Sequence, residues 1–421
     1  MDEGEAVARA VAQAWLAADG ESPAGAAELA PALLTALREH ELAPAEERDV
    51  LGDAVLSVLS VAPPFHERVL EELNQLLLTS EWAGKRPFPS GRPEHGRRVT
   101  VEVAYATDRE SLDQHGYYGG RRGNLDYGAI GVSLPDDARM CRTAKSRPWR
   151  FGFGQDRAAQ LERLATRPTS LTDFAAQLRR QVTQALSPEL LVFVHGYNMT
   201  FDDAVLRTAQ LAYDLDFEGV PLVFSWPSKG SAHHYIADAA STDWAQHDFR
   251  TVLEVALGAS GAERVHLVAH SMGNRLLVEW LVSPEARAAV DRGPGRLGQV
   301  VFAAPNVDAG KFARDVPRFA GPAQRFTLYA SSRDQALNVA RTLANGPRAG
   351  QAGRGVVVAS GVDTIDVSAL DTGLMSHSYV GDHRSVVSDL YYLLELEHAP
   401  ERRFGLRLVS GHDGPYWEFR A

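Results

Sequence analysis

Ser271 stands where its hydroxyl could act as a nucleophile. It follows an apolar segment, Val265–His270, and an amphipathic segment begins just after Gly273. A serine between a buried strand and a helix occupies a tight turn, the nucleophile elbow, which exposes the hydroxyl above the sheet. The turn crowds its flanks, so the residues two before and two after the serine must be small. Gly273 matches this pattern and Ala269 replaces the more usual glycine. We therefore predict acyl-transfer chemistry with Ser271 as the nucleophile.

Acyl transfer also needs hydrogen-bond donors for the oxyanion that forms during the reaction. The elbow places the backbone amide of Met272 at the start of a helix, where negative charge is favoured. A second donor is expected in the loop after the apolar segment Leu190–His195, which continues as Gly196-Tyr197-Asn198. Because glycine lets a backbone approach a substrate closely, we predict the Tyr197 amide as this donor. His195 is interpreted as a structural residue that pins the loop.

The base that activates the serine must itself be oriented by a carboxylate. In folds that carry a nucleophile elbow, the acid follows the serine in the sequence and the histidine follows the acid, each after a later strand. Asp334 follows the apolar segment Arg325–Ala330 and is the predicted acid. Asp308, after the preceding segment, is the alternative, although it could instead cap a helix through Lys311 and Phe312.

Two histidines follow the apolar segment Asp363–Ser368. His377 lies in a loop between serines and is the predicted base, which gives the triad Ser271–Asp334–His377. His383 begins the final helical segment, where a surface or capping role is the simpler interpretation. This chemistry requires no cofactor. No metal site is predicted, because His233 and His234 have no third ligand at a suitable spacing.

The elements expected to position these residues alternate between short apolar strands and helices. This pattern predicts an α/β-hydrolase fold with a mostly parallel, doubly wound sheet and flanking helices. Helices are expected over 202–215 and 274–282, and an edge hairpin is expected from the β-like runs 99–105 and 130–134. The predicted strands of the main sheet are 190–195, 221–226, 265–270, 299–304, 325–330 and 363–368.

The beginning of the chain has a different pattern. Residues 1–84 show apolar residues at helical spacing throughout and are predicted to form an N-terminal helical module. Residues 85–98 are rich in Pro, Gly and Arg and are interpreted as a linker, so 99–421 would be the hydrolase domain. The module is expected to recruit a protein partner or to mediate self-association; a lid or simple structural padding is the alternative.

The composition narrows the possible partners. The formal net charge of -11 gives no electrostatic reason to bind nucleic acid or anionic lipid. The single cysteine, Cys141, excludes an internal disulfide. The acidic, alanine-rich N-terminus does not resemble a signal peptide, and no stretch approaches the ~20 apolar residues of a transmembrane segment. A cytoplasmic protein is expected.

From about Val99 onward, most of the chain resembles the bacterial α/β-hydrolase family that is catalogued as a domain of unknown function. The resemblance implies the hydrolase fold and assigns the triad to Ser271, Asp334 and His377, but it implies little about the substrate. The matching segments, in order, are AYATDR (104–109), RGNLDYG (122–128), VSLP (132–135), VFVHGYN (192–198), FSWPSKG (224–230), AHSMGNR (269–275), AAPNVD (303–308), YASSRDQAL (329–337) and GLMSHSY (373–379).

These observations together predict a serine esterase that cleaves a small-molecule or lipid-like carboxylic ester through an acyl-enzyme. An acyltransferase, amidase or thioesterase could use the same triad. The competing interpretation from a different class is a partner-recruited scaffold or signalling protein with a hydrolase-like domain.

Overall fold

The computed structural model describes residues 98–112, 117–135, 161–163, 170–229, 235–292, 296–319, 321, 323–343, 346–353, 355–370 and 384–420. Residues Val99–Leu134 and Pro148–Ala421 belong to one compact unit. The predicted N-terminal module, 1–84, and the predicted linker up to residue 97 lie outside the described residues, so both stay predictions. No helix in the described part of the chain is long and apolar enough to span a membrane.

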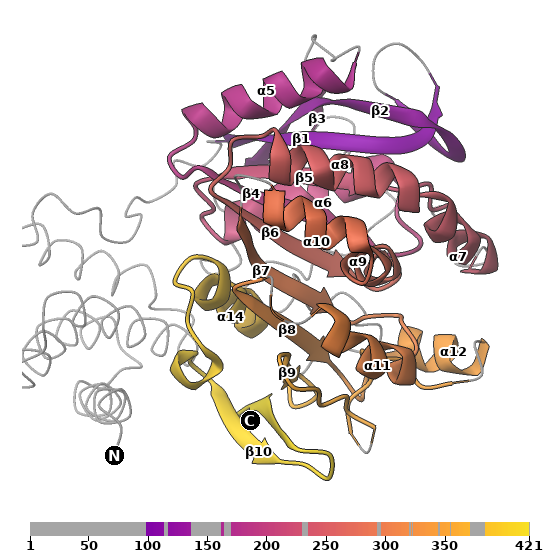
Figure 1. Ribbon diagram of the computed structural model, residues 1–421, viewed down its shortest axis with the longest axis vertical. Coiled ribbons are helices and arrows are strands. Elements are labelled where there is room, and N and C mark those ends of the chain that lie inside the picture. Colours follow the sequence, from indigo (N-terminus) through magenta and orange to yellow (C-terminus); the bar gives the residue numbers. More distant parts are fainter. Residues whose placement is uncertain are drawn as a thin grey trace, which may run out of the picture. The chain divides into compact units, whose positions relative to one another are not determined.

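The centre of the structure is one sheet in the order β10-β11-β9-β8-β7-β6-β4-β5-β1-β2-β3 (Figure 1). Its strands are β1 (Arg98–Ser111), β2 (Tyr118–Pro135), β3 (Leu161–Arg163), β4 (Glu189–Val194), β5 (Val220–Ser225), β6 (Arg264–His270), β7 (Arg296–Ala303), β8 (Arg325–Ala330), β9 (Asp363–Asp366), β10 (Leu406–Ser410) and β11 (Pro415–Phe419). Every pairing from β1 through β5, β4, β6, β7, β8 and β9 to β11 is parallel. The predicted mostly parallel sheet is therefore confirmed.

Helices cover both faces of this sheet. They are α5 (Leu171–Gln184), α6 (Phe201–Asp214), α7 (Tyr235–Trp244), α8 (Gln246–Gly258), α9 (Gly273–Leu281), α10 (Pro284–Arg292), α11 (Ala309–Phe319), α12 (Gln335–Leu343) and α14 (Arg384–Leu394), with a 3₁₀ turn η4 at Pro400–Arg402.

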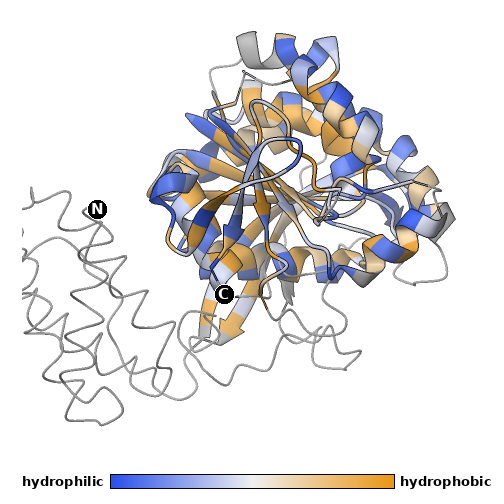
Figure 2. Cartoon of the chain, turned by 90° about the horizontal axis from the view of Figure 1, so that it is seen from below, coloured by the Kyte–Doolittle hydropathy of each residue, from blue (hydrophilic) through white to orange (hydrophobic). Residues whose placement is uncertain are grey.

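Alternate residues of the central strands point to opposite faces. One set, exemplified by Val192, Phe224 and Leu267, forms the main apolar cluster with buried residues of α5, α8, α9 and α11. On the opposite face Tyr105 packs against Phe201 of α6, and Tyr329 bonds to α14. Strands β4 and β5 are buried along their whole length, as expected for a sheet covered on both sides. Figure 2 shows the apolar residues concentrated on these central strands.

The sheet extends beyond what the sequence pattern predicted at both edges. Strand β2 begins at Tyr118 and so includes the glycine-rich stretch before the predicted run 130–134. Glycine is required there because a Cβ at position 123 would lie 2.5 Å from the Arg109 carbonyl oxygen, and one at 128 would lie 2.4 Å from the Tyr105 hydroxyl. At the other edge, the antiparallel hairpin of β10 and β11 adds to β9.

Candidate active site

Ser271 occupies the strained turn that the nucleophile elbow requires. It lies between β6 and α9 with φ of 51°, in the left-handed region that non-glycine residues rarely adopt. Its amide donates to the Ala303 carbonyl at 2.9 Å, and its carbonyl accepts from the amides of Asn306 at 3.0 Å and Asn274 at 3.2 Å. The surrounding backbone therefore holds the strained conformation in place, as is common at functional sites.

The side chain of Asn274 braces the same turn from inside. Its amide nitrogen lies 3.0 Å from the Ala269 carbonyl, 3.1 Å from the Ser271 carbonyl and 3.2 Å from the Ala303 carbonyl. Asn274 is fully buried. One side chain thus links the end of β6, the elbow and the end of β7.

Two glycines let the backbone close around Ser271. A Cβ at position 273 would lie 2.6 Å from the His195 carbonyl oxygen, so α9 can begin directly against the end of β4 only with glycine there. A Cβ at position 196 would lie 2.9 Å from both the Ser271 Cβ and His270 Nδ1. The loop after β4, which contains the predicted donor Tyr197, therefore lies against Ser271.

The second predicted donor, Met272, is the residue that precedes α9. Its amide has no hydrogen-bond partner among the residues that the structure describes. This amide is thus available to an oxyanion beside Ser271 at the positive end of a helix.

The loop after β4 is held by the segment after β5. The Asp238 carboxylate accepts from the Asn198 amide at 3.4 Å, the Ser228 hydroxyl at 2.6 Å and the Lys229 amide at 2.9 Å. The Trp226 ring stacks on His195 at 4.9 Å between ring centroids and donates to the His195 carbonyl at 2.8 Å. Because Trp226 is fully buried, it stabilises the loop from inside the fold.

Arg109, at the carboxyl end of β1, reaches the same loop. Its guanidinium is buried and donates to the Met199 carbonyl at 2.9 Å and the Ser228 carbonyl at 2.9 Å. Burial lowers the pKa of Arg109 to about 10, and nearby carboxylates, foremost Asp108, oppose this shift. Arg109 therefore stays a cation at neutral pH.

Asp334 lies after β8, two strands from β6 along the sheet. Its side chain is buried, and its Oδ1 accepts from the Leu337 amide at 2.9 Å, which caps α12. Since the carboxyl ends of parallel strands meet at one edge of a sheet, Asp334 and Ser271 follow strands that end at the same edge.

The alternative acid, Asp308, has both carboxylate oxygens engaged in other contacts. Oδ1 accepts from the Lys311 amide at 2.9 Å, and the Asp308 carbonyl accepts from the Phe312 amide at 2.9 Å, so Asp308 caps α11. Oδ2 pairs with Arg348 at 3.3 Å, and the Asp308 side chain is 46% exposed. Asp308 therefore has a structural role at the start of α11.

The candidate bases His377 and His383 lie outside the described residues, as do His233 and His234. The geometry of the full predicted triad is therefore not part of the described structure, and the assignment of the base stays a prediction.

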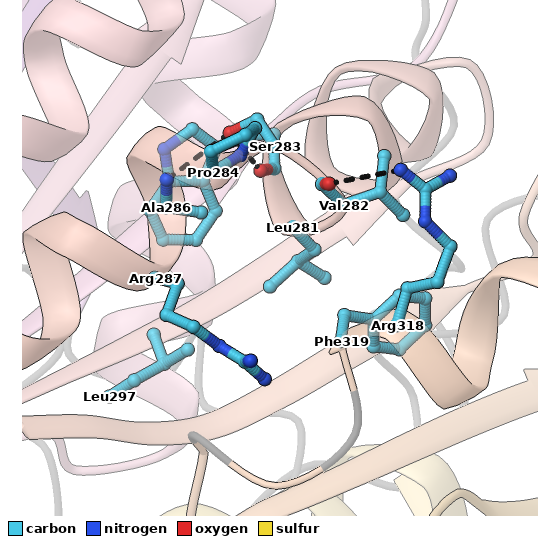
Figure 3. A pocket seen from close by; sticks show the side chains of 10 residues that line it. Leu281, Val282, Ser283, Pro284, Ala286, Arg287, Leu297, Arg318 and Phe319 are labelled. Atoms are coloured by element: carbon cyan, nitrogen blue, oxygen red, sulfur yellow. Dashed lines mark hydrogen bonds between the residues drawn. The ribbon is translucent and has the colours of Figure 1, made fainter.

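A cavity of about 290 Å³ lies elsewhere in the fold (Figure 3). It is lined by residues at the end of α9, the start of α10, the start of β7 and the end of α11, among them Leu281, Pro284, Leu297 and Phe319. Leu297 is near the amino end of β7, whereas Ser271 follows the carboxyl end of β6. Neither Ser271 nor Asp334 is among the described residues that line this cavity, and it is not part of the candidate site.

Sequence reasoning assigned no role to three polar residues that organise this site: Arg109, Asp238 and Asn274. Arg109 gives the clearest signal in the sequence, because a charged Asp-Arg pair ends the apolar run of β1. The acceptors of Arg109 come from distant segments, however, so the pair alone could not identify its partners.

Comparison with known proteins agrees with this geometry. The sequence model of a protein family described as an alpha/beta hydrolase of unknown function (DUF900) matches residues 170–394, which include β4 to β9 and the elbow. A search of curated proteins found no match. The matched region covers more than half of the chain and contains the loop after β4, Ser271 and Asp334, and the chain therefore belongs to this family of alpha/beta hydrolases of unknown function.

Proposed function

We propose that the protein is a serine hydrolase that cleaves carboxylic esters, with Ser271 as nucleophile, His377 as base and Asp334 as the orienting acid. One observation carries the proposal: Ser271 has a left-handed backbone conformation at the junction of β6 and α9, and Gly196 packs directly against it. A strained serine with a backbone loop at its side is the arrangement that acyl transfer needs.

In the proposed reaction, His377 removes the hydroxyl proton of Ser271 as Oγ attacks the ester carbonyl carbon. The Tyr197 and Met272 amides stabilise the oxyanion, and His377 then protonates the departing alcohol. Water attacks the acyl-enzyme with His377 again as base, which releases the acid and restores the serine. The chain's own residues supply each of these groups, without a cofactor.

Burial shapes the choice of first substrates. Ser271 is 0% exposed, which favours substrates small enough to reach a buried hydroxyl. Small activated esters are therefore the appropriate starting point, followed by p-nitrophenyl esters of increasing acyl length. The preferred length would define the substrate class.

The assignment of the nucleophile is tested with Ser271→Ala. We expect turnover of p-nitrophenyl acetate to fall on the order of 10⁴-fold, because nucleophile and base act as a unit, and labelling by a fluorophosphonate to disappear. Ser283→Ala is the matched control, since Ser283 caps α10 at the amino end of that helix. More than a tenth of wild-type turnover in Ser271→Ala would contradict the proposal.

The base is tested by comparing two histidines. His377→Ala should resemble Ser271→Ala, whereas His383→Ala should keep most activity. In the wild type, activity should rise with pH through an apparent pKa of about 6 to 7.5, as the base loses its proton. An inactive His383→Ala would show that the other histidine is the base.

The same assays separate the competing functions. Turnover of thioesters or amides in preference to esters would indicate a thioesterase or amidase, and transfer to an added alcohol would indicate an acyltransferase. A folded wild-type protein that is not labelled by fluorophosphonate would instead support a scaffold or signalling role.

A further inference from the structure

Arg109 connects three parts of the fold around the candidate site. Its five N–H groups all point at acceptors, and no carboxylate among the described residues lies within ion-pair distance of it. These acceptors are the Ser225 hydroxyl at 2.9 Å, the carbonyls of Gly119 at 3.2 Å, Ser228 at 2.9 Å and Met199 at 2.9 Å, and His195 Nε2 at 3.3 Å. A buried cation without an ion pair is costly, which suggests a role beyond stabilising the fold.

The neighbouring His195 is neutral. It is fully buried, and burial, reinforced by the positive charge of Arg109, lowers the pKa of His195 well below 6.5. A neutral imidazole carries one N–H and one acceptor nitrogen, so only one of two tautomers is present.

The contacts of His195 select the tautomer. Nε2 faces an N–H of Arg109, which cannot accept a hydrogen bond, so Nε2 is the acceptor. Nδ1 then carries the proton and donates to the Gly196 carbonyl, the shortest contact of the ring at 2.7 Å. The other tautomer, with the proton on Nε2, would donate to the Trp226 carbonyl at 3.1 Å. However, it would leave Nδ1 and the Gly196 carbonyl as two acceptors 2.7 Å apart. It would also point the Nε2 proton at an N–H of Arg109.

The Gly196 carbonyl belongs to the same peptide group as the Tyr197 amide. In a trans peptide the C=O and N–H point in opposite directions, so a bond that fixes the Gly196 carbonyl also fixes the direction of the Tyr197 N–H. Gly196 packs against Ser271. Arg109 secures the far end of the same loop through the Met199 carbonyl.

We propose that Arg109 and His195 are positioning residues for the oxyanion hole: Arg109 fixes the tautomer of His195, and His195 orients the Gly196–Tyr197 peptide toward the reacting carbonyl. This inference rests on the proposed function. It assigns a task in the reaction to a buried arginine on a strand that precedes every candidate catalytic residue in the sequence.

The first test is Arg109→Lys in the full chain. Lysine keeps the charge but cannot bridge the acceptors of a planar guanidinium. We expect kcat for p-nitrophenyl acetate and the second-order rate of fluorophosphonate labelling both to fall on the order of 10²-fold, as for loss of one oxyanion donor, with KM changed less than about threefold. Arg403→Lys is the matched control, a buried arginine outside the site, and should lose stability without losing kcat.

The second test uses His195, in case Arg109→Lys does not fold. His195→Ala removes the donor to the Gly196 carbonyl and should lower kcat about as much as Arg109→Lys. His195→Asn places an amide N–H near the position of Nδ1, so its kcat should be about tenfold higher than that of His195→Ala. The double variant Arg109→Lys/His195→Ala should have a kcat no lower than that of the less active single variant, because both residues act through one peptide group.

Wild-type kcat and labelling in folded Arg109→Lys, or in both His195 variants, would overturn the inference. Those results would leave the proposed function intact, since Ser271 would still be labelled. Failure of the wild type to react at Ser271 would instead overturn the proposed function, and the inference with it.

Discussion

Arg403 and Asp389 form an ion pair in which neither side chain is exposed, with 3.0 Å between Arg403 Nη1 and Asp389 Oδ2. The same carboxylate oxygen accepts from the Tyr329 hydroxyl of β8. Burial raises the pKa of Asp389, and the charge of Arg403 opposes this shift. The pair joins the segment that leads into the β10–β11 hairpin to α14, the helix that follows the segment containing His377.

Removal of one member of this pair should destabilise the fold strongly. Arg403→Ala leaves a buried carboxylate without its cation, so we expect the free energy of unfolding to fall by about 3–5 kcal/mol. The control is Arg407→Ala, because Arg407 is 57% exposed in its pair with Glu418 and should contribute less than about 1 kcal/mol. Urea unfolding measures both, and equal losses would contradict the prediction.

Gly196→Ala should lower activity with a smaller effect on stability. The new Cβ would stand 2.9 Å from the Ser271 Cβ, so we expect the loop to shift away from Ser271 and to carry the Tyr197 amide with it. We expect kcat for p-nitrophenyl acetate to fall on the order of 10²-fold. Gly258→Ala, where a Cβ meets nothing within 4 Å, is the control and should keep wild-type kcat. An active Gly196→Ala would mean that the loop does not serve the reaction.

The acid is tested by amide substitutions that leave the helix caps intact. Asparagine caps helices as well as aspartate does, so Asp334→Asn and Asp308→Asn change charge while preserving the bonds to the Leu337 and Lys311 amides. Loss of the orienting carboxylate should reduce kcat on the order of 10⁴-fold in Asp334→Asn, and Asp308→Asn should stay within a few fold of wild type. The reverse ranking would identify Asp308 as the acid.

Asp108 should make stability depend on pH. Burial, followed by the charge of Asp248, raises the pKa of Asp108 to about 7, against the opposing charges of Arg109 and Arg122. Neither of its carboxylate oxygens has a hydrogen-bond partner among the residues that the structure describes. Between pH ~4 and ~7 the folded state therefore holds a proton that the unfolded state has lost, so stability falls as pH rises through this window.

Asp108→Asn removes this penalty. We expect little difference from wild type near pH 4 and a relative gain that grows to the order of 2–4 kcal/mol by pH 8. Denaturant unfolding of both proteins across this range measures the effect, with the exposed Asp243 on α7 as the site of a control Asp→Asn change. A gain that is independent of pH would show that Asp108 does not titrate in this range.

The sequence by itself predicted the features that depend on residues close together along the chain. The apolar strands from β4 to β9 are each confirmed within three residues at either end, because a strand buried on both faces must be apolar along its length. The elbow at Ser271 was predictable for a similar reason, since its strand, small flanking residues and helix all lie within about twenty positions. The hairpin of β10 and β11 was missed because only Leu406 and Phe419 are buried in it, which leaves too few apolar positions for a recognisable pattern.

Only the tertiary structure decided how the site is held together. Arg109 bonds to residues 10, 86, 90, 116 and 119 positions away in the sequence, and most of these bonds end on backbone carbonyls, which every residue type carries. No residue pattern can specify such acceptors. The partner of Asp308 is likewise distant, since Arg348 lies forty positions from it in the sequence. Hydrogen bonds between distant segments form only once the sheet has brought its strand ends to one edge, so the elbow could be predicted from local sequence while the contacts that hold it could not.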